Sequence, residues 1–276
     1  MPIVNLYPHG ATAGVPPGAN SHKRAKRSTV VGWSQSSIRN NKLFLYSVDA
    51  KQLTGQGFAI TLTLRHCPET SDDWHRLLHT YLQRLYRRQV IRSHVVTEWQ
   101  RRGVPHLHGA VWFPSGQVIG WDTLVTPWLE VASEYEPAPG SQTAQPINDL
   151  LGWFQYMSKH AARGLYHYQR SPENIPAGWT KTGRMWSRRG DWPTRAAMRI
   201  YLDMPGYHRF RRLCRSYRLA DARSKNQRRR IASARRMLKC PDRKLCTVRG
   251  VSEWMELDES VRLVTATMTL GHRVVM

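Results

Sequence analysis

Alternating apolar and polar positions predict β-strands in the first half of the chain. Residues 57–64 read GFAITLTL, with an apolar side chain at every second position, which is the period of a strand with one buried face. Residues 91–98 and 106–113 are also typical of strands, and Gly103 lies between them as a turn residue. The pattern therefore predicts that these last two strands form a hairpin.

Apolar positions spaced three and four residues apart predict three helices. Residues 71–88 begin with Ser71 as the expected N-cap, followed by two aspartates that favour a helix N-terminus. Residues 122–134 predict a less regular helix, which Pro127 interrupts. Residues 147–163 predict another clear helix, which stops before a glycine.

Composition divides the chain into three regions. Residues 1–28 are rich in Pro, Gly, Ala and Ser and end in a basic cluster, so we expect a flexible basic arm. Residues 29–200 contain the predicted strands and helices, and residues 201–276 are a basic C-terminal extension. Residues 182–192 are expected to form a loop, and residues 261–275 alternate like a strand.

Positive charge is the strongest feature of the composition. The 276 residues include 42 Lys and Arg against 19 Asp and Glu, which gives a net charge of +23 at pH 7. Residues 209–249 alone carry 16 of these basic residues against two aspartates. Such a balance favours a polyphosphate partner, whose affinity should fall steeply with salt. An anionic membrane surface is the alternative partner.

The remaining composition bears on the expected cellular location of the protein. No run of about 18 apolar residues predicts a transmembrane helix. The N-terminal residues lack the basic start and apolar core of a signal peptide. The four cysteines form no CxxC pair, and their spacing is wrong for a zinc knuckle. We therefore expect a reduced, cytoplasmic protein without a membrane partner.

A carboxylate and two histidines lie at positions that suit metal coordination. His106 and His108 are separated by one residue on a predicted strand, so both side chains point to the same face. Glu98 lies on the partner strand of the predicted hairpin. Two imidazoles and one carboxylate leave room for water and substrate, which favours a catalytic divalent metal over a closed structural one.

The helix predicted over residues 147–163 offers a candidate nucleophile. Tyr156 and Lys159 lie three residues apart and therefore share a helix face. A tyrosine hydroxyl is a poor nucleophile at neutral pH because its pKa is about 10. It becomes effective where a nearby cation or metal stabilises the phenolate, and Lys159 can supply that charge. A core tyrosine is the alternative, because the neighbouring residues are apolar.

Three motifs together resemble those of the HUH endonucleases that initiate rolling-circle replication. PHLHG at 105–109, with Glu98 ahead of it, resembles the metal motif of that superfamily, in which a hydrophobic residue separates two histidines. ITLT at 60–63 resembles the first motif of the initiators, and YMSK at 156–159 resembles their nucleophile motif. The order and spacing also match. GRMWSRRG at 183–190 is similar to a segment that follows this core in filamentous-phage and related plasmid initiators.

The resemblance covers about residues 55–192 and implies both a fold and a reaction. The fold would be α+β, with a five-stranded, RRM-like antiparallel sheet flanked by helices. Glu98, His106 and His108 would hold Mg²⁺ or Mn²⁺. Tyr156 would attack a phosphate of single-stranded origin DNA and keep the 5′ end as a phosphotyrosine. The freed 3′-OH would prime a host polymerase.

Departures from the family pattern refine this expectation. Tyr166 and Tyr168 lie past Gly164, off the helix face of Tyr156, so the chain resembles the single-tyrosine initiators. No GxxxxGK[ST] motif is present, so no nucleotide-driven helicase is expected within the chain. Unwinding is then expected to come from a host helicase or from supercoiling.

Further residues are candidates for contacts with DNA. Basic and aromatic side chains at 183–190 can grip single-stranded DNA by charge and stacking. The threonines of the first motif are ordinary sheet residues that can also contact phosphate. The candidates are Thr61, Thr63, Lys159, Arg163, Arg184, Trp186, Arg188, Arg189, Arg228, Arg229 and Arg230.

Two other interpretations stay open. A conjugative relaxase or an HUH transposase would use the same chemistry, although relaxases usually carry a third histidine where this chain has Glu98. A non-catalytic nucleic-acid-binding protein on an RRM-like sheet would display stacking aromatics on its central strands. Here the corresponding positions hold polar residues, namely Thr61, Thr63, His106 and His108. A requirement for a divalent ion separates the enzymes from the binding protein.

Overall fold

The chain forms two compact units. The computed structural model describes residues 1–16, 29–161, 165 and 167–268. The outer unit, named for its place at the two ends of the sequence, comprises Met1–Arg24, Tyr46–Asp49 and Thr194–Met276. The central unit comprises Ala25–Leu45 and Ala50–Pro193.

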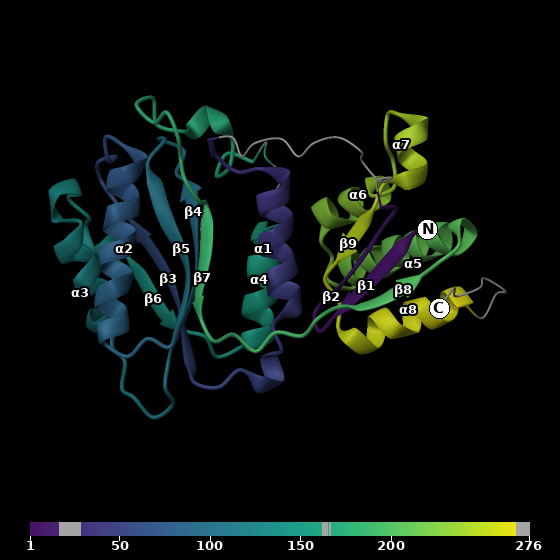
Figure 1. The fold of residues 1–276 in the computed structure, drawn as a ribbon, viewed down its shortest axis with the longest axis horizontal. Helices are drawn as coiled ribbons and strands as arrows, with labels where there is room; N and C mark the ends of the chain where they lie inside the picture. The colour runs from purple at the N-terminus through teal and green to yellow at the C-terminus, as the bar shows by residue number, and fades with distance from the viewer. Residues whose placement is uncertain (17–28, 162–164, 166, 269–276) are drawn as a thin grey trace. The chain divides into compact units, whose positions relative to one another are not determined.

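A five-stranded antiparallel sheet forms the middle of the central unit (Figure 1). The strand order is β6-β3-β5-β4-β7, and each strand is antiparallel to its neighbours. The bounds are β3 Gln56–Thr63, β4 Arg92–Trp99, β5 Pro105–Phe113, β6 Thr143–Pro146 and β7 Trp186–Gly190. The three predicted strands are confirmed as β3, β4 and β5, and the predicted α+β class is confirmed with them.

Helices cover both faces of this sheet (Figure 1). α2 (Ser71–Arg87) and α3 (Trp121–Val131) lie on one face, whereas α1 (Gln35–Ser47) and α4 (Leu150–Ala161) lie on the other. α2, α3 and α4 correspond to the predicted helices. α1 was not predicted, because its first two turns are almost entirely polar. Short 3-10 helices lie at Ala50–Gln52, Ser133–Tyr135, Pro139–Ser141 and Pro172–Asn174.

The start of α2 differs by one residue from the prediction. Thr70, and not Ser71, is the N-cap: its side chain accepts from the Asp73 amide, and the Asp73 carboxylate accepts from the Thr70 amide. This reciprocal pair is a capping box, which satisfies two otherwise unpaired amides. Ser71 is instead a buried residue of the first turn.

The two faces of the sheet are packed differently. Beneath α2 and α3, the Trp128 ring meets Trp74 and Tyr81 edge to face, with ring centroids 6.0 and 5.5 Å apart. Beneath α4, Trp112 of β5 stacks on Phe154 with centroids 6.3 Å apart. Aromatic packing of this kind contributes beyond the area it buries.

The β4–β5 hairpin depends on two glycines. Gly103 in the turn has φ of 77°, a left-handed conformation that glycine adopts without a steric penalty. Gly109 faces β4 so closely that a Cβ atom would lie 2.4 Å from the carbonyl oxygen of His94. The two strands can therefore pair along their full length.

The outer unit has its own antiparallel sheet, in the order β8-β1-β2-β9. The strands are β1 Ile3–Tyr7, β2 Gly10–Gly14, β8 Met198–Tyr201 and β9 Val251–Glu253. The helices are α5 Met204–Ser224, α6 Arg228–Arg236, α7 Arg243–Val248 and α8 Leu257–Met268. Side chains from both ends of the chain share one core, among them Val4, Leu6, Tyr207, Phe210 and Val264.

Three predictions about these regions were wrong. Residues 3–14 do not belong to a flexible arm: Val4 and Leu6 alternate inward on β1, so β1 and β2 form the middle of a sheet. Residues 17–28 lie outside the described residues. The strand expected at 261–275 is helical to Met268, because buried positions there recur at helical spacing, and 269–275 are not described. The loop expected at 182–192 contains β7.

The described part of the chain contains no helix that is long and apolar enough to cross a membrane.

Candidate active site

Strand register brings the predicted metal ligands to one face of the central sheet. Glu98 of β4 lies directly opposite His106 of β5. On the other side of β5, Thr63 and Thr61 of β3 lie opposite His106 and His108. Directly opposed residues in an antiparallel pair point to the same face. The face is the one that α1 and α4 cover.

His108 is the side chain that links this face to α4. Its Nδ1 atom lies 2.7 Å from the hydroxyl oxygen of Thr61, so the ring is held by a hydrogen bond to β3. Its Nε2 atom lies 3.4 Å from the hydroxyl of Tyr156. The His106 and His108 rings have centroids 5.8 Å apart, with His106 buried and His108 partly exposed.

Tyr156 lies on the accessible side of α4. Its side chain is 44% exposed, whereas Phe154 and Met157 of the same helix are buried. The alternative of a core tyrosine is therefore wrong for Tyr156. The Trp153 ring lies beside it, with centroids 5.8 Å apart. The Tyr156 hydroxyl is therefore accessible and lies beside the His108 imidazole.

Glu98 has a buried partner that the sequence did not indicate. The Glu98 and Arg170 side chains are 0% and 1% exposed, and Nη2 of Arg170 donates to Oε1 of Glu98 over 3.2 Å. The Arg170 guanidinium lies 4.3 Å from the centroid of the Trp33 ring. A buried carboxylate requires such a countercharge. No local pattern predicts a pair separated by 72 residues.

The donor atoms on this face suit a divalent metal by type. Imidazole nitrogens and a carboxylate are ligands of Mn²⁺ and related ions, and the register brings them to one face. Within the described residues, however, no three His, Cys, Asp or Glu side chains converge on one point. The Glu98–Arg170 ion pair is one reason, because it directs that carboxylate toward a guanidinium.

Two predicted residues of the α4 region are only partly covered by the structure. α4 includes Lys159 one turn beyond Tyr156, and nothing is described of the Lys159 side chain. Arg163 lies outside the described residues. The expected shared face of Tyr156 and Lys159 thus follows from the helix backbone alone.

The structure places the residues predicted to contact DNA in different environments. In the first motif, the Thr61 hydroxyl is hydrogen-bonded to His108, and the Thr63 amide donates to Oε1 of Gln142 over 2.8 Å. The 183–190 segment lies along the edge of the central sheet, and its Arg184, Arg188 and Arg189 are exposed.

Arg228, Arg229 and Arg230 begin α6 in the outer unit. Arg228 and Arg229 are exposed, whereas Nη2 of Arg230 pairs with Oδ2 of Asp221 at 2.6 Å. Two of the three arginines therefore present their charge to solvent.

A third histidine on the same face has a structural role. His94 of β4 is buried, and its Nε2 atom lies 2.8 Å from Oδ1 of Asn41 on α1. Burial, with a smaller contribution from the nearby charge of Arg188, lowers the pKa of His94 to about 3. The ring is neutral at physiological pH and packs against Phe44.

Fold and site together define an α+β protein whose antiparallel sheet presents two histidines and a carboxylate to a helix with an exposed tyrosine. Residues 57–164 match the family described as Replication-associated protein ORF2/G2P. The chain is 44% identical to Replication-associated protein G2P of Pseudomonas phage Pf3, over 99% of both chains.

Two proteins of Xylella fastidiosa with the provisional name of replication protein are similar to the same extent. The chain is 47% identical to that of strain Temecula1, over 93% of this chain and 100% of the relative. It is 48% identical to that of strain 9a5c, over 99% of both chains. No solved structure matches. The chain belongs to this family of replication-associated proteins.

Proposed function

We propose that the protein is a site-specific single-strand DNA endonuclease and strand transferase that initiates rolling-circle replication of a phage or plasmid. The observation that carries this proposal is the exposed Tyr156 hydroxyl 3.4 Å from Nε2 of His108, on a face shared with His106 and Glu98. An exposed nucleophile beside an oriented imidazole suits phosphoryl transfer to tyrosine.

In the proposed reaction, the Tyr156 oxygen forms a bond to phosphorus, and the bond from phosphorus to the 3′ oxygen breaks. The 5′ end stays on the protein as a phosphotyrosine, and the free 3′-OH primes a host polymerase. When its Nδ1–H donates to Thr61, His108 presents an unprotonated Nε2 as a ligand atom beside the Tyr156 hydroxyl, and the tyrosine proton passes to water. Thr61 is then a positioning residue for that imidazole, since its hydrogen bond sets the tautomer.

We further propose that Glu98, His106 and His108 hold Mg²⁺ or Mn²⁺. A divalent ion there would neutralise charge on a phosphate oxygen. The residue types support this proposal. Glu98 would then bind the ion while its carboxylate is also paired with Arg170. Lys159, one turn along α4 from Tyr156, is the proposed second source of positive charge.

Covalent capture of DNA tests the nuclease directly. The protein is incubated with Mn²⁺ and labelled single-stranded oligonucleotides and is then run on a denaturing gel. We expect a protein–DNA adduct at a 5′ end that Tyr156→Phe abolishes. Tyr168→Phe is the matched control, because Tyr168 is likewise exposed, at 40%, but lies beyond the end of α4. An adduct of undiminished yield in Tyr156→Phe would refute the nucleophile.

The alternatives make different predictions in this assay. A non-catalytic DNA-binding protein would bind the oligonucleotides in a salt-sensitive manner and form no adduct with any of them. A relaxase or transposase would form the same adduct on other target sequences. The names of the relatives, which refer to replication, favour the initiator. The partners expected for an initiator are origin DNA, a host helicase and a host polymerase in the bacterial cytoplasm.

A further inference from the structure

A groove with serine and arginine side chains in its lining lies beside the candidate active site, at the edge of the central sheet. Its volume is about 540 Å³, and it runs between the first turns of α1 and strand β7. Ser34, Ser36, Ser37 and Asn40 contribute one wall, and Arg184 and Arg188 contribute charge to the other. None of the residues that line this groove is acidic.

The groove is on the same face of the sheet as the candidate active site. Trp186 of β7 lies opposite Val96 of β4, which lies opposite His108 of β5. The three residues therefore form one row across the sheet. With neighbouring strands about 4.8 Å apart, the backbones of Trp186 and His108 are roughly 10 Å apart. A strand of DNA at His108 can reach the groove within a short stretch of chain.

Contacts along the groove connect it to the Glu98 end of the site. The Gly32 amide, in the groove, donates to Oγ1 of Thr182 over 2.6 Å. The next residue, Trp33, lies under the Arg170 guanidinium that pairs with Glu98. Directly before β7, the Met185 carbonyl oxygen accepts from the amide of Thr97, the neighbour of Glu98. Residues that line the groove are thus hydrogen-bonded or adjacent in sequence to residues around Glu98.

Strand alternation sorts the arginines that the sequence grouped together. Arg188 lies over the Phe44 ring of α1 at 4.5 Å, whereas Arg189 lies over the Tyr86 ring of α2 at 4.1 Å. The two guanidiniums are therefore on opposite faces of the sheet. Trp186 stacks on Phe44 with ring centroids 6.1 Å apart, so it lies on the same side as Arg188.

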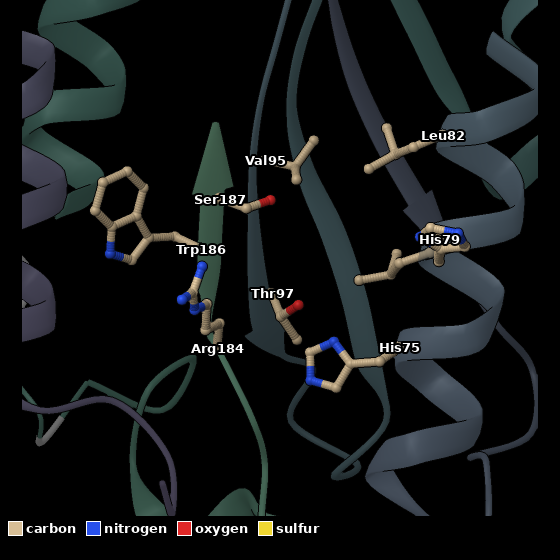
Figure 2. A pocket seen from close by; sticks show the side chains of 9 residues that line it. His75, His79, Leu82, Val95, Thr97, Arg184, Trp186 and Ser187 are labelled. Atoms are coloured by element: carbon tan, nitrogen blue, oxygen red, sulfur yellow. The ribbon is translucent and has the colours of Figure 1, made fainter. Parts of the chain in front are cut away.

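The opposite side of β7 provides a contrast. Figure 2 shows the pocket there, with His75, His79 and Leu82 of α2 facing the β4–β7 edge and the Trp186 ring directed away from α2. Its volume is about 360 Å³. Nε2 of His75 is already engaged, because it lies 2.7 Å from the Thr182 carbonyl oxygen and donates to it. Arg184 and Ser187 line both this pocket and the groove, whereas Arg188, Ser36 and Ser37 line the groove only.

We propose that the groove between α1 and β7 binds the phosphates of single-stranded DNA that flank the nucleotide attacked by Tyr156. The inference rests on the proposed function for its substrate class. Serine hydroxyls, an asparagine amide and two guanidiniums are donors for phosphate oxygens, and such contacts hold register without reading sequence. A positively charged groove with an aromatic floor is typical of single-strand binding.

Binding in the nucleophile-free variant Tyr156→Phe tests the groove, with a fluorescent oligothymidylate as the probe. Ser36→Glu is added to that background, because Ser36 is exposed in the first turn of α1, where a glutamate favours the helix. The matched control is Thr80→Glu, which adds the same charge at an exposed position of α2. Arg188→Gln is compared with Arg189→Gln in the same way.

We expect Ser36→Glu and Arg188→Gln to weaken binding at least about fivefold more than their controls. Each lost phosphate contact should also reduce the slope of log affinity against log salt by about 0.7. Equal affinities and slopes within both pairs would overturn the groove. Because the probe is bound and not cleaved, this result is separate from the nuclease: absence of any adduct in the unmodified protein refutes the proposed function alone.

Discussion

The face of the central sheet beneath α2 and α3 is apolar and aromatic, whereas the face beneath α1 and α4 carries three histidines and a carboxylate and lies next to Tyr156 of α4. The same strands make both. On β5, Leu107 is fully buried toward α2, and its neighbours His106 and His108 point to the other side. One period-two strand can thus supply the core and the chemistry at adjacent positions.

Substitutions at neighbouring positions of one strand should therefore affect different properties of the protein. Changes on the α2 face should reduce stability, because they remove packed apolar volume. Changes on the α4 face should reduce activity and affect stability less. A residue whose substitution reduces both stability and activity has a role in holding the site together.

The largest expected effect is loss of DNA cleavage from the α4 face. His106→Ala combined with His108→Ala removes the proposed nitrogen ligands and the imidazole beside Tyr156. We expect adduct formation to fall by at least about 100-fold, in line with the loss of groups that stabilise charge in the transition state. The assay is adduct yield with Mn²⁺, set beside the urea midpoint of the same protein. Full yield in this double variant, or cleavage in chelator, would count against the site.

Arg170→Gln should reduce both the stability of the protein and its cleavage activity. It leaves the buried Glu98 carboxylate without its guanidinium, and breaking a buried pair typically costs about 3–5 kcal/mol. The added change Glu98→Gln should restore part of the stability but not the cleavage. Chemical unfolding of both variants measures this recovery. Equal stability of Arg170→Gln and the unmodified protein would show that the ion pair does not hold Glu98.

On the opposite face, Leu107→Ala should destabilise the protein by about 2–5 kcal/mol, since Leu107 is 0% exposed. At temperatures where the variant stays folded, adduct yield should change little. The measurement is the free energy of unfolding from urea titration, together with adduct yield at low temperature. A stable but inactive Leu107→Ala protein would break the division between the two faces.

Short-range periodicity was sufficient to predict the hairpin and the shared face of its candidate residues. The strands near β4 and β5, the shared face of His106 and His108 and the helix that carries Tyr156 all follow from spacing within about ten residues. The facing of Glu98 and His106 follows too, because Gly103 sets the turn between their strands.

Contacts between distant segments could not be read in the same way. Arg170 reaches Glu98 only because the chain after α4 returns to the end of β4, where the Trp99 amide donates to the Gln169 carbonyl oxygen. β1 and β2 have five residues each and pair with β8 and β9 from the far end of the chain. β2 reads GATAG, and this composition, rich in glycine and alanine, resembles that of an arm.

The smallest effect distinguishes two histidines of the same face. His94 is buried beneath α1 with a pKa near 3, while His108 is partly exposed beside α4. The unfolded chain takes up a proton at His94 near its ordinary value of 6.5, and the folded one does not until about pH 3. Stability from this group is therefore complete above the unfolded pKa and declines as the pH falls.

In the window between these two pKa values, the loss approaches about 1.4 kcal/mol per pH unit. His94→Gln keeps a donor for Asn41 and removes the titration, so its urea midpoint should depend less on pH between about 7 and about 5. Equal pH dependence in the two proteins would show that His94 is not held neutral. The expected result means that burial beneath a helix, and not the sheet face alone, decides whether a histidine has a structural role or stays accessible for chemistry.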